Sequence, residues 1–332
     1  WTRLSAARPR ARRPTRARGA FVSLALVSLA LGTMALFVGA CASGGPTDDG
    51  AAPTSVVSDR PSPTGTDGGG GRGGGDGSPR PGDDDADQGD TAAPVAPGSL
   101  AVPPPAWLGT RVLALGPDGF AAALPTPTDL VDRQLITPDH LPRPNEERFM
   151  HTVAPVPADV LAASTWHDDC PVAAEDLRYV TVTFWGFDGW VHRGELLVHR
   201  DAVAAMVAGF GTLFERRFPI EEMRIIDDED LAAPPTGDGN ITSAFVCREG
   251  VESSSWSQHA YGAAVDINPF HNPYVRGDVV LPELASVYTV RHPVRPGMLT
   301  AADVAGFVDA GWRWGGEWTS RKDYMHLSAA GT

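Results

Sequence analysis

Alternating and helically spaced apolar residues predict a folded region between residues 107 and 332. The runs at 178–185 (RYVTVTFW) and 191–199 (VHRGELLVH) are rich in β-branched and aromatic residues, and the glycine-containing turn between them predicts a β-hairpin. The apolar positions that follow recur at helical spacing, so residues 201–217 are expected to form an amphipathic helix that ends before Pro219.

Two shorter elements are predicted further along the chain. The run at 223–227 (MRIID) has the composition of a short strand. Thr300 is a candidate N-cap with Asp303 three residues on, and Gly311 is a candidate stop signal, which predicts a second helix. A hairpin and separate helices without a regular strand–helix–strand rhythm favour the α+β class, with a mainly antiparallel sheet and flanking helices.

The first forty residues have the composition of an export signal. They carry seven Arg and no acidic residue or Lys, and an uncharged apolar run at 19–40 follows. The ending Val-Gly-Ala before Cys41 resembles the lipobox of bacterial lipoproteins, which implies a lipid on Cys41 and a membrane-anchored, extracytoplasmic protein facing the cell wall. Alternatively, the apolar run stays in the bilayer as an uncleaved anchor helix. The chain begins at Trp1, so its true start is left open.

Residues 41–106 consist mainly of Gly, Pro, Ser, Thr and Asp, a composition that predicts a disordered tether because it offers little apolar surface to bury. The tether separates the signal from an N-terminal brace or extension at 107–163 and from a main domain at 164–332. The formal net charge is -14, and removing the +7 of residues 1–40 leaves -21 on the rest of the chain. A body this acidic disfavours nucleic-acid binding.

Two segments carry candidate metal ligands. His259 and Asp266 lie seven residues apart around Gly262, and Asp323 lies three residues before His326. Because side chains alternate along a strand, odd separations put partners on opposite faces, so each pair needs a turn between its members. Gly262 supplies the first turn, and a loop at 322–323 is expected to supply the second.

If these side chains converge, His259, Asp266 and His326 provide two imidazoles and one carboxylate. This set suits one Zn²⁺ per chain and leaves a fourth position for water, whose pKa the ion lowers towards about 7. Asp323 is then free to act first as a general base and afterwards as a general acid.

The pattern S-x-H-x-x-G-x-A-x-D, followed by W-G-G-x-W and D-x-M-H, resembles a known enzyme family over about residues 164–327. The family comprises the VanY-like zinc D-alanyl-D-alanine carboxypeptidases and L-alanyl-D-glutamate endopeptidases, which have the Hedgehog/DD-peptidase fold. The resemblance implies a peptidoglycan stem peptide as substrate, His259, Asp266 and His326 as zinc ligands, and Asp323 as catalytic acid/base. Arg248, in NITSAFVCR, matches the arginine that binds the oxyanion.

Several alternatives remain open at this point. The bond that is cut and the choice between exo and endo action are undetermined. The chain is expected to be a monomer, and a non-catalytic cell-wall-binding or sensory module of the same fold is the competing hypothesis. The motif H-E-x-x-H of many protein-cleaving zinc enzymes is missing from the sequence, which disfavours a general protease.

Other candidate residues have simpler interpretations. Arg248 is also compatible with an ordinary surface arginine, and Asp323 with a turn cap. His271 is expected on a loop that shapes the substrate cleft. Trp314 and Trp318 are expected to pack beneath the Gly-Gly turn, and the alternative is that they line the cleft for peptide or sugar. The remaining histidines lack ligand spacing and are expected to be solvated: His140, His151, His167, His192, His199 and His292.

The cysteines predict one disulfide bond. Cys41 belongs to the leader, which leaves Cys170 and Cys247 as an even pair in an exported domain. A bond between them would restrain the segment that carries Arg248. The alternative is two unpaired buried thiols.

Overall fold

The computed structural model describes residues 96–117, 119–250 and 254–330, which belong to one compact unit. The predicted signal, Cys41 and residues 41–95 of the predicted tether lie outside the described residues. Among the residues that are described, no helix has the length and apolar character needed to span a membrane.

The largest sheet forms around a long β-hairpin, as the sequence predicts. Strand β2 is central, pairing antiparallel with β1 and β3 and parallel with β4. The four strands of this sheet are β1 (His151–Pro155), β2 (Leu177–Gly186), β3 (Val191–His199) and β4 (Pro219–Ile220). The hairpin turn uses Gly189 at a φ of 80°, a backbone conformation that glycine adopts without strain.

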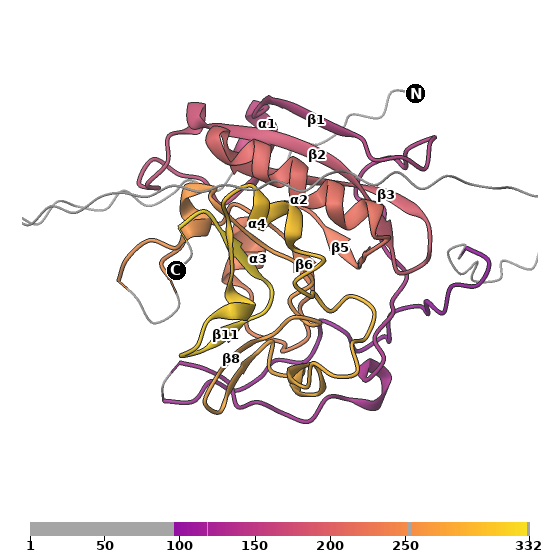
Figure 1. Cartoon of the computed structure of the whole chain (residues 1–332). Coiled ribbons are helices and arrows are strands. Elements are labelled where there is room, and N and C mark those ends of the chain that lie inside the picture. Colours follow the sequence, from indigo (N-terminus) through magenta and orange to yellow (C-terminus); the bar gives the residue numbers. More distant parts are fainter. Residues whose placement is uncertain (1–95, 118, 251–253, 331–332) are drawn as a thin grey trace, which may run out of the picture. The chain divides into compact units, whose positions relative to one another are not determined.

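Helix α2 (Val203–Glu215) lies against the sheet (Figure 1) and supplies much of the main core through Met206, Phe210 and Leu213. It confirms the predicted amphipathic helix, with a short 3₁₀ turn, η3 (Arg200–Ala202), before it. Helix α4 (Ala305–Asp309) packs on α2 so closely that a Cβ on Gly209 would lie 2.2 Å from the Phe307 ring.

The second predicted helix is shorter than expected. Thr300 and Asp303 form a turn ahead of α4, in which the Thr300 amide and hydroxyl both donate to Asp303 Oδ2, at 2.8 and 2.6 Å. The other oxygen of Asp303 accepts from Arg216 Nε at 2.7 Å. The Thr300 carbonyl accepts from the amides of Asp303 and Val304, at 3.0 and 3.2 Å, so a turn does begin at the predicted cap, but the regular helix begins only at Ala305.

The remaining strands form three small sheets. One has the order β10 (Arg313–Trp314), β12 (His326–Ser328) and β7 (Ala264–Asp266). Another has the order β11 (Lys322–Asp323), β8 (Tyr274–Arg276) and β9 (Val279–Leu281), and the last pairs β5 (Glu222–Met223) with β6 (Ile241–Thr242). These sheets and few helices confirm the predicted α+β class.

The strand predicted at 223–227 is wrong beyond Met223. Asp227 instead begins helix α3 (Asp228–Ala232) through a reciprocal capping box with Asp230, which also pairs with Arg224. A cap at this position ends the extended conformation that the apolar residues alone indicate. The other short helices are α1 (Ala158–Ala163), η1 (Thr128–Leu130), η2 (Ala174–Asp176), η4 (Gln258–Tyr261), η5 (Ser286–Thr289) and η6 (Gly315–Glu317).

Residues 96–106, which composition assigns to the tether, pack against the body. The Ala96 amide donates to Asp188 O at 2.8 Å, and Val102 exchanges backbone hydrogen bonds of 2.9 Å with Gln134 and Ile136. The partners lie far along the chain, so local composition gives no sign of them. The described part of the predicted tether is thus attached to the body.

The segment at 107–163 is anchored by a buried arginine. Arg133 donates to both carboxylate oxygens of Glu221, at 2.8 and 2.6 Å, and to Asp238 O at 2.8 Å. His192, expected in solvent, is buried instead, with its two ring nitrogens 2.8 and 2.9 Å from carboxylate oxygens of Asp139 and Asp188. The prediction for His192 is wrong because Asp139 comes from a distant segment and Asp188, four residues earlier in the hairpin turn, reaches the other ring nitrogen.

Candidate metal centre

The first His–Asp pair is brought together by the glycine turn that the sequence predicts. His259 lies on η4, where Ser257 accepts a hydrogen bond from the His259 amide. Gly262 then adopts a φ of 66° and leads into β7, which carries Asp266. A Cβ at Gly262 would lie 2.5 Å from the His199 backbone nitrogen, so this tight reversal requires glycine.

The second pair is arranged differently from the prediction. Residues 322–323 form strand β11 rather than a loop, and Asp323 is paired with Tyr274 of β8. The chain bends at 324–325 and then enters β12, where His326 lies directly opposite Asp266 in an antiparallel register. The turn that the odd spacing demands therefore follows Asp323.

The structure brings His259, Asp266 and His326 into one cluster. His259 Nε2 lies 3.2 Å from His326 Nδ1 and 3.3 Å from Asp266 Oδ2, and His326 Nδ1 lies 3.1 Å from Asp266 Oδ1. Both imidazoles are buried. The ligand atoms all lie within 4.8 Å of one another, so the three residues could hold a metal ion.

The hydrogen bonding of the cluster fits a cation. His259 Nδ1 is 2.5 Å from Ala244 O, which can only accept, so Nδ1 donates and the lone pair of the neutral ring is on Nε2, facing the cluster. Burial opposes ionisation of Asp266, but His259 and His326 outweigh it and hold the Asp266 pKa well below its usual range. His326 faces the cluster with Nδ1, 3.1 Å from Asp266 Oδ1, and its Nε2 is buried without a hydrogen-bond partner among the described residues.

Asp323 lies near this cluster as an unpartnered carboxyl. Its Oδ1 atom is shielded from solvent and has no hydrogen-bond partner in the part of the chain that is described. Burial raises the pKa of Asp323 to about 7, with a further rise from Asp266 and opposing effects of His326, Arg321 and Arg248. The carboxyl can therefore both take and release a proton near neutral pH.

Gly315 leaves the space in which Asp323 sits. A Cβ at Gly315 would lie 2.5 Å from the Asp323 backbone oxygen and 2.9 Å from its Cβ. The neighbouring Trp314 is buried, its indole donates to Tyr324 O at 2.8 Å, and a Cβ at Gly316 would lie 2.4 Å from its ring. The predicted burial beneath the Gly-Gly turn is confirmed for Trp314, whereas Trp318 is only partly buried.

Arg248 is partly buried and bonded by one guanidinium nitrogen to Glu249 O at 3.1 Å. Its segment is tied to η4 through bonds from Val246 N to His259 O and from Ser257 N to Arg248 O, at 3.3 and 3.1 Å. The preceding residue, Cys247, forms the predicted disulfide with Cys170. This bond occupies both sulfur atoms, so the nearby His167 has no thiolate partners with which to bind a metal.

The prediction for His271 holds for its backbone but not for its side chain. His271 lies in a turn between β7 and β8, as expected, but its side chain is fully buried: its Nε2 lies 2.9 Å from Arg133 O, its ring stacks on Phe187, and burial lowers its pKa to about 4. Sequence reasoning did not single out Arg321, whose charge influences Asp323. The available signal was its position two residues earlier, a spacing that puts side chains on one face of an extended chain.

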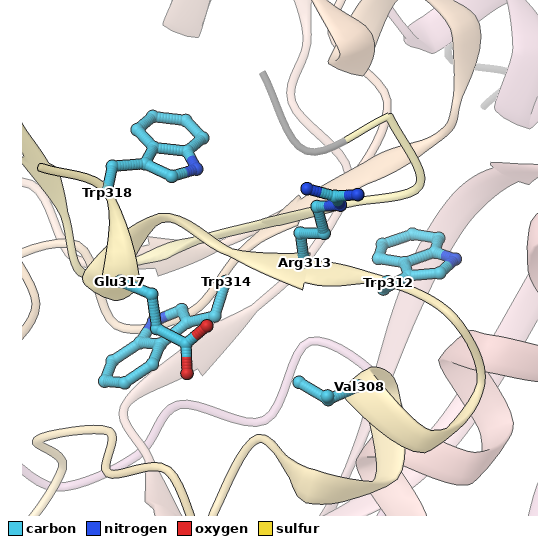
Figure 2. Close-up of a pocket in the computed structure, with 6 residues that line it drawn as sticks. All are labelled: Val308, Trp312, Arg313, Trp314, Glu317 and Trp318. Carbon is cyan, nitrogen blue, oxygen red and sulfur yellow. The ribbon is translucent and has the colours of Figure 1, made fainter.

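A pocket lies beside this region and contains none of the three clustered ligands. Figure 2 shows it with its lining residues, which are Val308, Trp312, Arg313, Trp314, Glu317 and Trp318. In this view the indole of Trp318 points away from that of Trp314. The Trp318 ring faces His326 instead, with 5.7 Å between the ring centroids.

Comparison with known proteins gives one match. Residues 251–329 match the family model of D-alanyl-D-alanine carboxypeptidase, whereas no curated protein and no solved structure matches the chain. The matched span contains His259, Asp266, Asp323 and His326, and Arg248 lies just before it. The part of the chain that forms the candidate metal centre is therefore similar to a family of peptidases.

Proposed function

We propose that this protein is a zinc-dependent peptidase that hydrolyses an amide bond in peptidoglycan stem peptides. The observation that carries the proposal is the buried His259–Asp266–His326 cluster beside the unpartnered carboxyl of Asp323. The similarity of residues 251–329 to D-alanyl-D-alanine carboxypeptidases supports this reaction class. A VanY-like site on a Hedgehog/DD-peptidase fold is part of the same proposal.

Two imidazoles and a carboxylate are the ligand types that zinc prefers when one position is left for substrate or water. Zinc bound at the cluster supplies a Lewis acid and lowers the pKa of a water molecule towards about 7. We propose one ion per chain, held by His259, Asp266 and His326. The bond from His259 to Ala244 O orients the first imidazole for this role.

Asp323 is the proposed proton carrier. Its unpartnered Oδ1 is available to accept the proton of the attacking water, and the same oxygen then delivers that proton to the leaving amine. A carboxyl whose pKa is raised by burial holds the transferred proton more readily than a solvated one does.

Arg248 is the proposed oxyanion donor. Its positive charge reaches the site, where it opposes the rise in the Asp323 pKa. The disulfide and the two backbone bonds to η4 restrain the segment that carries the guanidinium. A restrained cation stabilises developing negative charge without having to reorganise during the reaction.

The Asp323→Asn variant tests this proposal. We expect it to keep its fold and its zinc while losing hydrolysis of purified peptidoglycan, measured by mass spectrometry of the released muropeptides. Asp309→Asn is the matched control, because Asp309 is an exposed carboxylate at the end of α4. Undiminished turnover in Asp323→Asn would exclude the mechanism, and no turnover in the zinc-loaded parent protein would favour a non-catalytic binding module.

The cellular setting belongs to the same proposal. An extracytoplasmic, monomeric protein held at the membrane by a lipid on Cys41 would act on the cell wall above it. The leader and Cys41 lie outside the described residues, so this part rests on the sequence pattern alone.

A further inference from the structure

The disulfide lies beside an exposed histidine, His167. His167 Nε2 is 3.5 Å from Cys247 Sγ, and the His167 amide donates to Cys170 Sγ at 3.2 Å. The Cys170 amide in turn donates to His167 O at 2.9 Å, which closes a tight turn. The ligand atoms of the three residues all lie within 4.8 Å of one another. Two sulfur atoms and one imidazole thus share a small region that solvent can reach.

Contacts other than the disulfide also hold the two cysteine segments together. The buried amide of Cys247 donates to Thr165 Oγ1 at 2.9 Å. Val172 and Phe245, one from each segment, are buried in the same apolar cluster. The two sulfur atoms and the imidazole should therefore stay close together when the disulfide is reduced.

A dithiol reductant can open this disulfide from the solvent side. Cys170 is partly exposed and Cys247 is buried, so a reductant thiolate reaches Cys170 Sγ first. Its attack forms a mixed disulfide with Cys170, and Cys247 leaves as a thiolate. The second thiol of the reductant then displaces Cys170 and completes the reductant's own disulfide. The dithiol has supplied two electrons and two protons, and both cysteines are reduced.

His167 favours the departure of Cys247 in this step. The Asp169 amide donates to His167 Nδ1 at 3.3 Å, so the neutral ring carries its hydrogen on Nε2, which faces the Cys247 sulfur. A hydrogen-bond donor next to a thiolate stabilises its charged form.

The three side chains match the ligand geometry of zinc. Bonds of about 2.3 Å to sulfur and about 2.0–2.1 Å to nitrogen, at a tetrahedral angle, place the two ligand atoms about 3.6 Å apart. The distance from His167 Nε2 to Cys247 Sγ, 3.5 Å, already fits. Two sulfur ligands lie about 3.8 Å apart in such a site, and the sulfur atoms can separate to this distance only after the covalent bond is broken.

Metal binding uses the other tautomer of His167. The ring hydrogen moves to Nδ1, which lies 4.0 Å from a carboxylate oxygen of Asp169. This carboxylate is exposed and can turn to accept the hydrogen. Asp168 is exposed as well, so the turn carries two negative charges that favour a cation.

We infer that His167, Cys170 and Cys247 bind a Zn²⁺ ion when the disulfide is reduced, with water in the fourth position. The two thiols release their protons to solvent as the ion binds, which leaves the site without net charge. The ion would join the same two segments that the disulfide joins, so the residue before Arg248 stays restrained in both states. The site does not depend on the peptidase assignment, because none of its ligands belongs to the candidate metal centre.

Cobalt(II) tests the site, because a thiolate ligand gives this ion an intense near-ultraviolet charge-transfer absorption that nitrogen and oxygen ligands do not give. The folded full chain is reduced with a resin-bound dithiol, and the resin is removed without admitting oxygen. Cys41→Ser is present in every sample, so that no third thiol competes. We expect Co²⁺ to produce the absorption in the reduced protein only, and added Zn²⁺ to abolish it by displacing the cobalt.

His167→Ala tests the imidazole ligand. Its affinity for cobalt should fall by more than the roughly 10- to 100-fold that loss of an outer hydrogen-bond partner costs. His151→Ala is the matched control, because His151 is an exposed histidine on β1, and it should bind cobalt as the parent protein does. Zinc should also raise the Tm of the reduced parent protein more than that of reduced His167→Ala, since the candidate metal centre is the same in both.

Three results would overturn the inference. The folded protein could resist the dithiol, with no free thiols found by titration. Cobalt could give no charge-transfer absorption in the reduced protein, or bind equally well to His167→Ala and His151→Ala. Each of these results leaves the proposed function intact, and a parent protein that hydrolyses no peptidoglycan leaves the thiol site intact.

Discussion

A methyl group added at Gly315 should impair catalysis through the position of Asp323. The Cβ of an alanine at Gly315 would lie 2.5 Å from the Asp323 backbone oxygen, whereas ordinary contacts begin at about 3.4 Å. The two backbones must separate by roughly 0.9 Å, the difference between these distances, because neither contact atom is the end of a flexible side chain. The substitution thus displaces the proposed proton carrier and leaves its chemistry unchanged.

Two expected costs set the size of the effect, one on stability and one on the reaction rate. Overpacking of this kind costs about 1–3 kcal/mol, which for a domain of this size lowers Tm by roughly 2–4 °C per kcal/mol. Misplacing a catalytic group by about 1 Å costs on the order of 100-fold in rate. We therefore expect Gly315→Ala to lose roughly 100-fold in kcat on a D-alanyl-D-alanine peptide, with a reduced Tm and with full zinc occupancy by elemental analysis, because no ligand changes.

Gly239→Ala is the control, since a Cβ there would have no neighbour within 4 Å. If Gly315→Ala matches Gly239→Ala in both kcat and Tm, the close approach of the two backbones is not real and the reasoning fails. If Tm falls while kcat on the folded fraction is unchanged, the position of Asp323 is not critical for the reaction.

Three further predictions concern stability. In the zinc-free protein, the raised pKa of Asp323 (about 7 against 3.8) favours the protonated carboxyl in the folded state, so its stabilising contribution is present below about pH 4 and is lost as the pH rises through about 7. The free energy of unfolding, measured with urea, should therefore rise in Asp323→Asn relative to the parent protein between pH 4 and pH 8. A difference between the two proteins that does not change with pH would contradict the raised pKa of Asp323. Chelation of a metal held at roughly 100 to 1,000 times its Kd should cost about 3–4 kcal/mol, seen as a lower Tm in calorimetry, and Asp266→Asn should show no such response. Replacing Cys170 and Cys247 together by Ser should cost about 4 kcal/mol in urea unfolding, given their separation of 77 residues, and an unchanged midpoint would refute the chain-entropy argument.

The ligand cluster could be predicted because the residue spacings that indicate it lie within short stretches of the sequence. His259 and Asp266 flank a glycine that must reverse the chain, and the odd spacing from Asp323 to His326 demands a bend. The position of the second bend was not predictable, because β11 exists only through pairing with β8. Strands of two residues have almost no periodic signal of their own.

Non-local contacts account for the other differences. His192 lies between Asp188, four residues earlier in the same hairpin, and Asp139, which is 53 residues away and gives no local sign of this contact. Residues 96–106 are poor in large apolar side chains, yet backbone bonds to residues 134–136 and 188 attach them to the body. Local propensity does not include such partners.

The pairing of β7 with β12 gives metal binding a second consequence. His326 and Asp266 are direct cross-strand partners, so a slip of one residue would turn His326 to the opposite face and bring an apolar neighbour, Met325 or Leu327, into its place. A cation that needs both ligands can be captured only in the correct register. Metal binding would thus stabilise only those molecules in which the two strands, about sixty residues apart in the chain, pair in the correct register. Molecules with a shifted register would remain metal-free.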